Sequence, residues 1–374
     1  VKEVDRALNG LEAGTVVAAI TAPQSEETRL LLDLMKPLNS TILSTRMVTS
    51  GVDNDHHLLQ MHLPPQHLTK AMIALMKYYS WDYVTVVHFE QPSELSDAYK
   101  YLMKSIHSHN MVVAADLGID KDSLKKSRFL SDLVQKVIAK SKFGARVVIL
   151  LLPSDVLDQF FEAAMQFSED LGENYILWIT VGNLDILQKY SAITQGCISI
   201  QSARPDYPDM HEILSPEFFQ SNPWLSDLMA NIYDCRGWGC HTSAEIIARS
   251  YKLNRESNVA SIVDAASVLW NGIQETINKA CSNQHCTKTS VLQDLFNDVV
   301  SSDVVSLRGN RVWFDHNHVY GNAALEILNL RRVDPQTLGF SVIGNYSRGD
   351  WLHIENRGGR SYLKDSMEMG LNNI

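Results

Sequence analysis

The sequence of 374 residues has no long apolar run, few cysteines and a deficit of positive charge. No uninterrupted apolar run exceeds six residues, the length of the run from Val147 to Leu152, whereas a membrane-spanning helix needs roughly 20. The 33 Lys and Arg residues are outnumbered by 43 Asp and Glu residues, a net charge of -10. Such a balance opposes binding to nucleic acid or anionic lipid. We therefore predict no membrane span within these residues and no nucleic-acid partner.

The sequence also lacks the motifs that enzymes built from alternating strands and helices use to hold phosphates or nucleophiles. The turn after the first predicted strand, from Ile20 to Ser25, contains no Gly, although a dinucleotide site needs Gly there for the backbone to approach the pyrophosphate. There is no G-x-x-x-x-G-K-[ST], no G-x-S-x-G and no H-E-x-x-H, the signatures of phosphate, nucleophile and zinc sites. We predict no catalysis and no cofactor.

Two groups of His residues are potential metal ligands. The first group falls within 12 residues and the second flanks Asn317: His56, His57, His62 and His67, and His316 and His318. Neither group has ligands at fixed helical spacing, which a pre-arranged metal site on a helix would need. We predict surface loops and no metal site.

Four of the five cysteines form two close pairs, Cys235 with Cys240 and Cys281 with Cys286, each enclosing four residues. Such short polar loops can close as disulfides in an oxidising compartment. Zinc is the alternative because a His lies beside each pair, although neither pair has the two-residue spacing frequent in structural zinc sites. The fifth, Cys197, precedes a predicted strand, and we expect a buried free thiol there, with an interchain bridge or a missing partner as alternatives.

Two N-glycosylation sequons, which begin at Asn39 and Asn345, indicate the same compartment as the paired cysteines. The sequence begins at Val1 without an initiator Met or an apolar signal segment, so we expect a mature or trimmed piece of a longer protein. We predict a cell-surface, extracellular location, with any membrane attachment supplied by segments outside this sequence.

Apolar β-rich runs alternate with helical patterns along the chain. The run 147–152 is apolar without alternation, as expected for a strand inside a parallel sheet. Helical spacing predicts a helix over 68–79, directly before a strand at 83–87. We predict an α/β fold with two doubly wound parallel-sheet lobes joined by multiple crossovers. The predicted strands are 15–20, 83–87, 111–115, 147–152, 175–180, 197–200, 325–330 and 351–354, and the other predicted helices are 24–35, 97–108, 128–140, 155–171 and 290–299.

Two Pro-containing stretches mark candidate crossings between the lobes. One includes Pro64 and Pro65, and the other includes Pro205, Pro208 and Pro216. The predicted parts are 1–64 and 203–324 for lobe 1, 65–202 for lobe 2, 325–356 for the closing strands of lobe 2, and 357–374 for a tail toward a membrane-proximal region.

Several segments between about residue 16 and residue 355 resemble the ectodomain of class C, metabotropic-glutamate-type receptors and, more loosely, bilobed periplasmic-type binding domains. The stretch Ala71-Met-Ile-Ala-Leu-Met-Lys-Tyr-Tyr-Ser-Trp-Asp-Tyr-Val-Thr-Val-Val-His88 resembles the helix and strand that open the second lobe. Asn222-Pro-Trp224, the loop from Cys281 to Cys286, and Val312-Trp-Phe-Asp315 resemble later family segments. The resemblance implies a non-catalytic domain whose pocket lies between two lobes, and a first lobe that is abbreviated or trimmed.

The sequence departs from this family where the glutamate pocket should be. Only Ser25 remains of a Gly- and Ser-rich turn, and it lies beside Glu26 and Glu27, whose charges would repel the ligand carboxylate. Thr45 begins the counterpart of a Ser-Ala-Thr stretch, and Ser93 lies near the position of the family's pocket Tyr. The resemblance implies that a degenerate pocket would be lined by Ser25, Thr45, His88 and Ser93.

These features predict a receptor-like ectodomain that binds a protein partner, such as a receptor tyrosine kinase on an apposed cell, as ligands of the bride-of-sevenless kind do. One alternative is a sensor of a small molecule, either an amino acid other than glutamate or a sugar. Others are a soluble periplasmic-type binding protein and an α/β enzyme. The segment from Gln24 to Met35 resembles the family's dimer-forming helix, so a homodimer through it is expected, with core packing as the alternative.

Overall fold

The computed structural model describes residues 18–21, 33, 35, 40–45, 58–61, 65–91, 93–126, 128–202, 257–281, 288–305, 311–314, 325–332, 338–347 and 351–354. The chain divides into two compact units. Unit 1 comprises Val1–His62 and Arg204–Asn322, and unit 2 comprises Leu63–Ala203 and Ala323–Ile374. Each unit is therefore built from two separate stretches of the chain.

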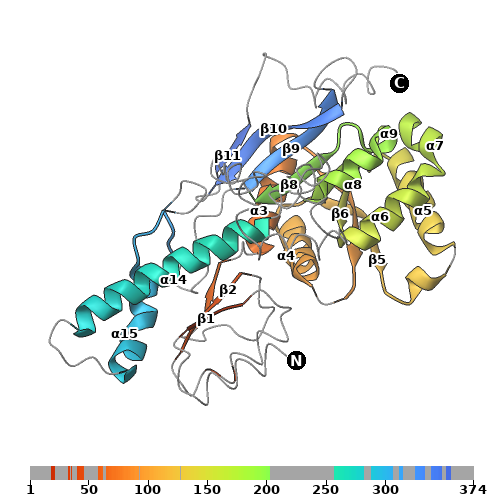
Figure 1. The fold of residues 1–374 in the computed structure, drawn as a ribbon. Helices are drawn as coiled ribbons and strands as arrows, with labels where there is room; N and C mark the ends of the chain where they lie inside the picture. The colour runs from red at the N-terminus through yellow and green to blue at the C-terminus, as the bar shows by residue number, and fades with distance from the viewer. Residues whose placement is uncertain are drawn as a thin grey trace, which may run out of the picture. The chain divides into compact units, whose positions relative to one another are not determined.

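Unit 2 is organised around an eight-stranded sheet with the order β11-β10-β9-β8-β7-β6-β4-β5 (Figure 1). Its parallel part consists of β4 (Tyr83–Phe89), β5 (Val112–Ile119), β6 (Val147–Leu151), β7 (Leu177–Val181) and β8 (Ile198–Ser202). The antiparallel part consists of β9 (Leu325–Arg332), β10 (Leu338–Ser347) and β11 (Trp351–Ile354). The predicted α/β fold with parallel-strand sheets is confirmed.

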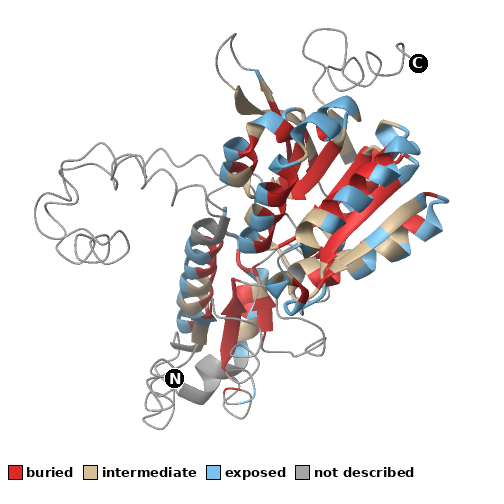
Figure 2. Cartoon of the chain, turned by 90° about the vertical axis from the view of Figure 1, so that its right-hand side faces the viewer, coloured by how far each residue is buried: buried red, intermediate tan, exposed pale blue. Residues whose placement is uncertain are grey.

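Helices cover both faces of the parallel part of this sheet. Helices α3 (Pro65–Tyr78) and α4 (Glu94–Ser108) pack on one face, and α5 (Phe129–Lys142) and α6 (Ser154–Met165) pack on the other. In Figure 2 the central strands are buried, while the outer faces of these helices are exposed. This two-sided cover explains why β6 is apolar at every position, since its five residues are all buried.

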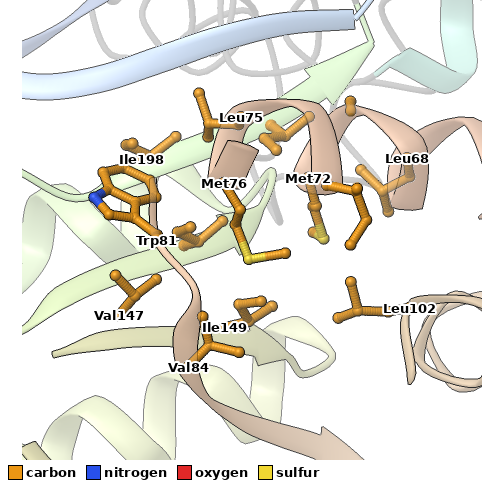
Figure 3. Close-up of a cluster of buried hydrophobic side chains, with 14 of the residues drawn as sticks. Leu68, Met72, Leu75, Met76, Trp81, Val84, Leu102, Val147, Ile149 and Ile198 are labelled. Carbon is orange, nitrogen blue, oxygen red and sulfur yellow. The ribbon is translucent and has the colours of Figure 1, made fainter. Parts of the chain in front are cut away.

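The core on the α3 side is filled by one face of that helix. Leu68, Met72, Leu75 and Met76 recur at helical spacing, and all four are buried against the sheet (Figure 3). The chain leaves the helix through Trp81, whose backbone N–H donates to the carbonyl of Met76 at 2.8 Å. The predicted helix–strand unit is therefore present, and the indole of Trp81 closes the end of the core where β4 begins.

The core on the opposite face surrounds Trp178 of β7. Its ring lies edge-on to Phe160 and Phe161, and its Nε1–H donates to the carbonyl of Ile193 at 2.8 Å. Such a bond satisfies the one polar atom of a fully buried indole. Cys197 lies in the same core as a buried free thiol, as predicted. Burial raises the pKa of this thiol to about 12, so it stays protonated and unreactive at neutral pH.

In unit 1 the described strands β1 (Ala18–Thr21), β2 (Thr41–Ser44) and β3 (Leu58–Gln60) form a parallel sheet in that order. Helices α14 (Ser257–Cys281) and α15 (Lys288–Ser301) pack against each other. A Cβ at Gly272 would lie 2.4 Å from a methyl carbon of Val299, so Gly272 permits this close helix contact.

Several element predictions need correction. The helix predicted over 155–171 is two helices, α6 and α7 (Ser168–Glu173), and strand β5 continues to Ile119 beyond its predicted end. Strand β10 was not predicted; it contains a bulge after Val342, and a Cβ on Gly344 would lie 2.5 Å from the carbonyl oxygen of His353. Short helices α8 (Leu184–Lys189) and α9 (Ser191–Thr194) follow β7.

Candidate functional site

The strand order of unit 2 reverses between β4 and β6. The chain runs from β4 outward to β5 and then returns to the other side of β4 for β6, β7 and β8. In open parallel sheets ligands bind at such a switch point, beyond the carboxyl ends of the strands. The loops that follow β4 and β6 lead into the amino ends of α4 and α6. We call this end of the parallel strands the carboxyl edge. A ligand-binding site is therefore expected at the carboxyl edge.

A cluster of four polar or aromatic side chains lies at this edge, and we call it the His88 cluster: His88, Glu90, Tyr99 and Asp116. The ring of His88 stacks on that of Tyr99, with centroids 3.6 Å apart and planes 14° from parallel. Asp116 links the two rings, because its Oδ1 lies 3.2 Å from His88 Nε2 and its Oδ2 accepts from the Tyr99 hydroxyl at 2.6 Å. Strand β4, helix α4 and strand β5 each supply one of these three side chains.

Burial governs the protonation of His88. Desolvation lowers the pKa of His88 below its ordinary 6.5, while the charges of Asp116 and Glu90 act in the opposite direction. A neutral imidazole at pH 7 can therefore donate one proton from Nε2 to Asp116. Burial and the bond to Asp116 raise the pKa of Tyr99 to about 12, so its hydroxyl remains a donor.

The side chain of Glu90 lies over Gly118 of β5. Its carboxylate occupies the space that a Cβ on residue 118 would take. Glu90 and Asp116 are both exposed at the surface, while His88 is buried. The cluster thus presents two carboxylates to solvent, and this negative potential favours a cationic group over a carboxylate.

Ser93, a predicted pocket residue, caps α4. Its backbone is extended and its hydroxyl oxygen accepts from the N–H of Ser96 at 3.2 Å, which satisfies one of the helix's unpaired donors. Ser93 and His88 therefore flank the same loop after β4. The predictions on Ser93 and His88 as ligand contacts stay predictions.

Thr45, the predicted pocket residue of unit 1, is 1% exposed. Its hydroxyl donates to the carbonyl of Thr21 at 3.2 Å, and its backbone N–H donates to the same oxygen at 2.9 Å. Thr45 therefore ties the end of β2 to the end of β1. Ser25, the fourth predicted pocket residue, lies outside the described residues.

A second polar group at the carboxyl edge was not predicted. The hydroxyl of Ser154, the first residue of α6, donates to Asn183 Oδ1 at 2.6 Å. Gly182 and Asn183 both have positive φ, near 60°, and Ser199 donates to the Gly182 carbonyl at 2.8 Å. The Gly-Asn pair after a predicted strand is a turn signal that could have indicated this group.

The remaining predicted site residues are placed only in part. Asn39, Cys235, Cys240 and Cys286 lie outside the described residues, and Cys281 is the last residue of α14. Asn345 lies within β10, paired with Glu326 of β9 and His353 of β11. Within the predicted dimer helix only positions 33 and 35 are described, both helical, and Met35 is buried. Disulfides, glycosylation and the dimer stay predictions.

The described residues hold neither a metal-ligand cluster nor a helix that could span a membrane. No cluster of three or more His, Cys, Asp or Glu side chains is arranged there to hold a metal ion. No described helix is both long and apolar enough to cross a bilayer.

Comparison with models of known protein families assigns the chain to a family. Residues 2–332 match the model of the receptor family ligand binding region, which covers most of the 374 residues. The chain belongs to this family, whose bilobed domains resemble type 1 periplasmic binding proteins and occur in class C receptor ectodomains. It is a ligand-binding, receptor-type domain, of a family that is generally non-catalytic and typically extracellular.

Proposed function

We propose that this chain is the extracellular, non-catalytic domain of a class C receptor-like membrane protein, and that it acts by binding a protein partner. A receptor tyrosine kinase on an apposed cell is the kind of partner that we expect. The observation that carries this proposal is that two predicted pocket hydroxyl groups, those of Thr45 and Ser93, already form hydrogen bonds within the fold. The Thr45 hydroxyl is bonded to the backbone of β1, and the Ser93 oxygen caps α4.

Glutamate is disfavoured as the ligand for an electrostatic reason as well. Two unit charges 4 Å apart interact by about 4 kcal/mol at the effective dielectric of a protein surface. The exposed carboxylates of Glu90 and Asp116 would repel both carboxylates of glutamate. A surface that binds a protein partner needs neither Thr45 nor Ser93 as a ligand contact.

Binding of the purified, glycosylated domain to intact cells tests this proposal. A labelled multimer of the chain should bind cells of the source organism saturably, and prior protease treatment of those cells should abolish the binding. A heat-unfolded sample is the control for non-specific adhesion. Absence of saturable, protease-sensitive binding across a range of cell types would count against a protein partner.

The His88 cluster supports a second candidate function, an extracellular sensor of a small molecule other than glutamate. Its two exposed carboxylates suit an ammonium group, and the Tyr99 ring suits a cation or an apolar face. The cluster lies at the strand ends where ligands of parallel sheets bind. An amino acid with a neutral or basic side chain would meet these requirements, and a sugar could use the same hydrogen-bond acceptors.

A thermal-shift screen separates the two functions. A ligand at 100 times its Kd should stabilise the fold by about 2.7 kcal/mol, whereas a domain that binds only proteins should not respond to amino acids or sugars. Asp116→Asn is the matched variant, since it keeps the size of the side chain and removes one charge. A shift seen with the wild type and lost in Asp116→Asn would establish the sensor.

A further inference from the structure

Exposed apolar side chains line the opposite end of the parallel strands in unit 2, here called the amino edge. One such residue lies at the start of a strand, or within four residues before it, for each of four neighbouring strands: Val112 for β5, Tyr83 for β4, Phe143 before β6, and Tyr175 before β7. Their exposed fractions are 55%, 37%, 79% and 54%. A run of exposed large apolar residues is unusual on a soluble surface and marks interaction sites more often than single ones do.

The strand order places these four residues along one edge of the sheet, in the order Tyr175, Phe143, Tyr83 and Val112. Tyr83 and Val112 are register partners, and a Cβ on Gly144, the neighbour of Phe143, would lie 3.9 Å from a ring carbon of Tyr83. The N–H of Leu177 donates to the Arg146 carbonyl at 2.8 Å, which joins the start of β7 to the start of β6. With strands about 4.8 Å apart, the row spans about 14 Å.

Basic residues lie near members of this row in the sequence. Four exposed or partly exposed basic residues lie within six residues of a member of the row, and none forms an ion pair with a described residue: Lys77, Lys140, Lys142 and Arg146. The positive charge is concentrated at Phe143, because Lys140, Lys142 and Arg146 lie within three residues of it. No Asp or Glu lies within six residues of Phe143, whereas Tyr83 and Tyr175 have carboxylates closer in the sequence. The three lysines lie in the last turns of α3 and α5, where a positive charge interacts favourably with the helix dipole. Their ammonium groups can still bind a carboxylate of a partner.

We infer that the amino edge is a docking surface for an acidic protein segment that carries an aromatic or aliphatic anchor side chain. This inference rests on the proposed function, because it assigns the surface that the protein partner would contact. Tyr and Phe supply apolar contact area at low entropic cost and are enriched among residues that dominate binding energy. The cations near Phe143 add attraction for the carboxylates of such a segment and speed association.

A protein segment fits the amino edge better than a lipid surface does. Interfacial membrane binding relies on one broad apolar face of a helix, with Trp, Phe and Leu inserted into the bilayer. Here the apolar residues come from the first residues of β4 and β5 and from the segments that lead into β6 and β7, and two of the four are Tyr. Binding to anionic vesicles is therefore an outcome that would overturn the inference.

The test uses the full chain with a random copolymer of Glu and Tyr as probe, and poly-glutamate as a probe without the anchor. The wild type should bind the copolymer saturably and more tightly than poly-glutamate. Phe143→Ser should weaken copolymer binding about tenfold or more, as expected for loss of an anchor. Lys142→Glu should weaken it at low ionic strength, and added salt should shrink that effect.

Two matched controls come from the same unit. Tyr101 is an exposed aromatic in the middle of α4, away from the amino edge, and Lys136 is an exposed lysine on the same helix as Lys142. Tyr101→Ser and Lys136→Glu should bind the copolymer as the wild type does. An unchanged unfolding midpoint for all four variants shows that they fold.

The outcomes separate this inference from the proposed function. Equal copolymer binding by wild type and Phe143→Ser overturns the docking surface, as does tighter binding to phosphatidylserine vesicles than to the copolymer. If the wild type binds cells and Phe143→Ser binds them equally, the docking surface fails and the proposed function stands. If no cells are bound but copolymer binding depends on Phe143 and Lys142, the proposed function fails and the surface stands.

Discussion

The two ends of the parallel strands in unit 2 differ in how their side chains are used. At the carboxyl edge, polar groups are bonded within the protein: His88 to Asp116, Ser93 to the backbone of α4, and Ser154 to Asn183. At the amino edge, apolar rings such as those of Tyr83 and Phe143 are exposed. Buried polar groups and exposed apolar patches are the informative exceptions to ordinary burial. Substitutions should therefore change stability at one edge and binding at the other.

The largest loss of stability is expected for His88→Ala. The change removes a buried ring, its stack on Tyr99 and its bond to Asp116, at an expected cost of about 2–3 kcal/mol. Urea unfolding followed by Trp fluorescence measures this loss. A cost similar to that of an exposed substitution such as Tyr101→Ser would show that the His88 cluster is not structurally important.

Loss of the helix cap at Ser93 should have a smaller effect. Ser93→Ala leaves the N–H of Ser96 without its partner and should destabilise the unit by about 1 kcal/mol. Ser93→Asp should restore most of this, because Asp also caps helices and its charge favours the helix amino end. If both variants unfold at the same urea concentration, the Ser93 hydroxyl has a role other than capping.

Stability should also fall as the pH drops below about 6.5, through His88. Burial lowers the folded-state pKa of His88 below 6.5, so the unfolded chain binds the proton first and stability rises with pH in that window. Asp116 raises the folded-state pKa of His88, so Asp116→Asn should lower this pKa further. Stability should then continue to fall with pH down to a lower pH than in the wild type. The difference in unfolding free energy between wild type and His88→Phe, measured from about pH 7.5 to about pH 5.5, reports the effect.

The smallest change in stability is expected at the amino edge. Phe143 is 79% exposed, so Phe143→Ser should alter the free energy of unfolding by no more than about 0.5 kcal/mol. The same denaturation measurement applies. A loss above about 1 kcal/mol would mean that the ring packs within the fold, and the contrast between the two edges would disappear.

Much of the fold of unit 2 could be predicted because its local patterns are strong. The spacing of Leu68, Met72 and Leu75 predicted α3, and the continuous apolar run of β6 predicted a two-sided sheet. Strand β10 was missed because its sequence mixes Gly, Asn and Ser with apolar residues, and its pairing with β9 and β11 supplies what the pattern lacks. The break between α6 and α7 was missed because apolar spacing continues through it.

The candidate site was harder to predict, since its members are distant in the sequence. His88 was identified through a family resemblance, whereas Tyr99 and Asp116 were not, because a helix and a neighbouring strand bring them together. Likewise nothing local indicates that Tyr83, Phe143 and Tyr175 share one edge. Only the strand order places them in a row.

The sequence alone determined the class of fold, the family to which the chain belongs and the absence of phosphate-binding and nucleophile motifs. These properties follow from periodicity, residue order and short motifs, which are local. The tertiary structure decided which groups meet at the two edges of the sheet and which hydroxyls are already bonded. Those properties depend on strand order and burial, and these arise only when distant segments pack together.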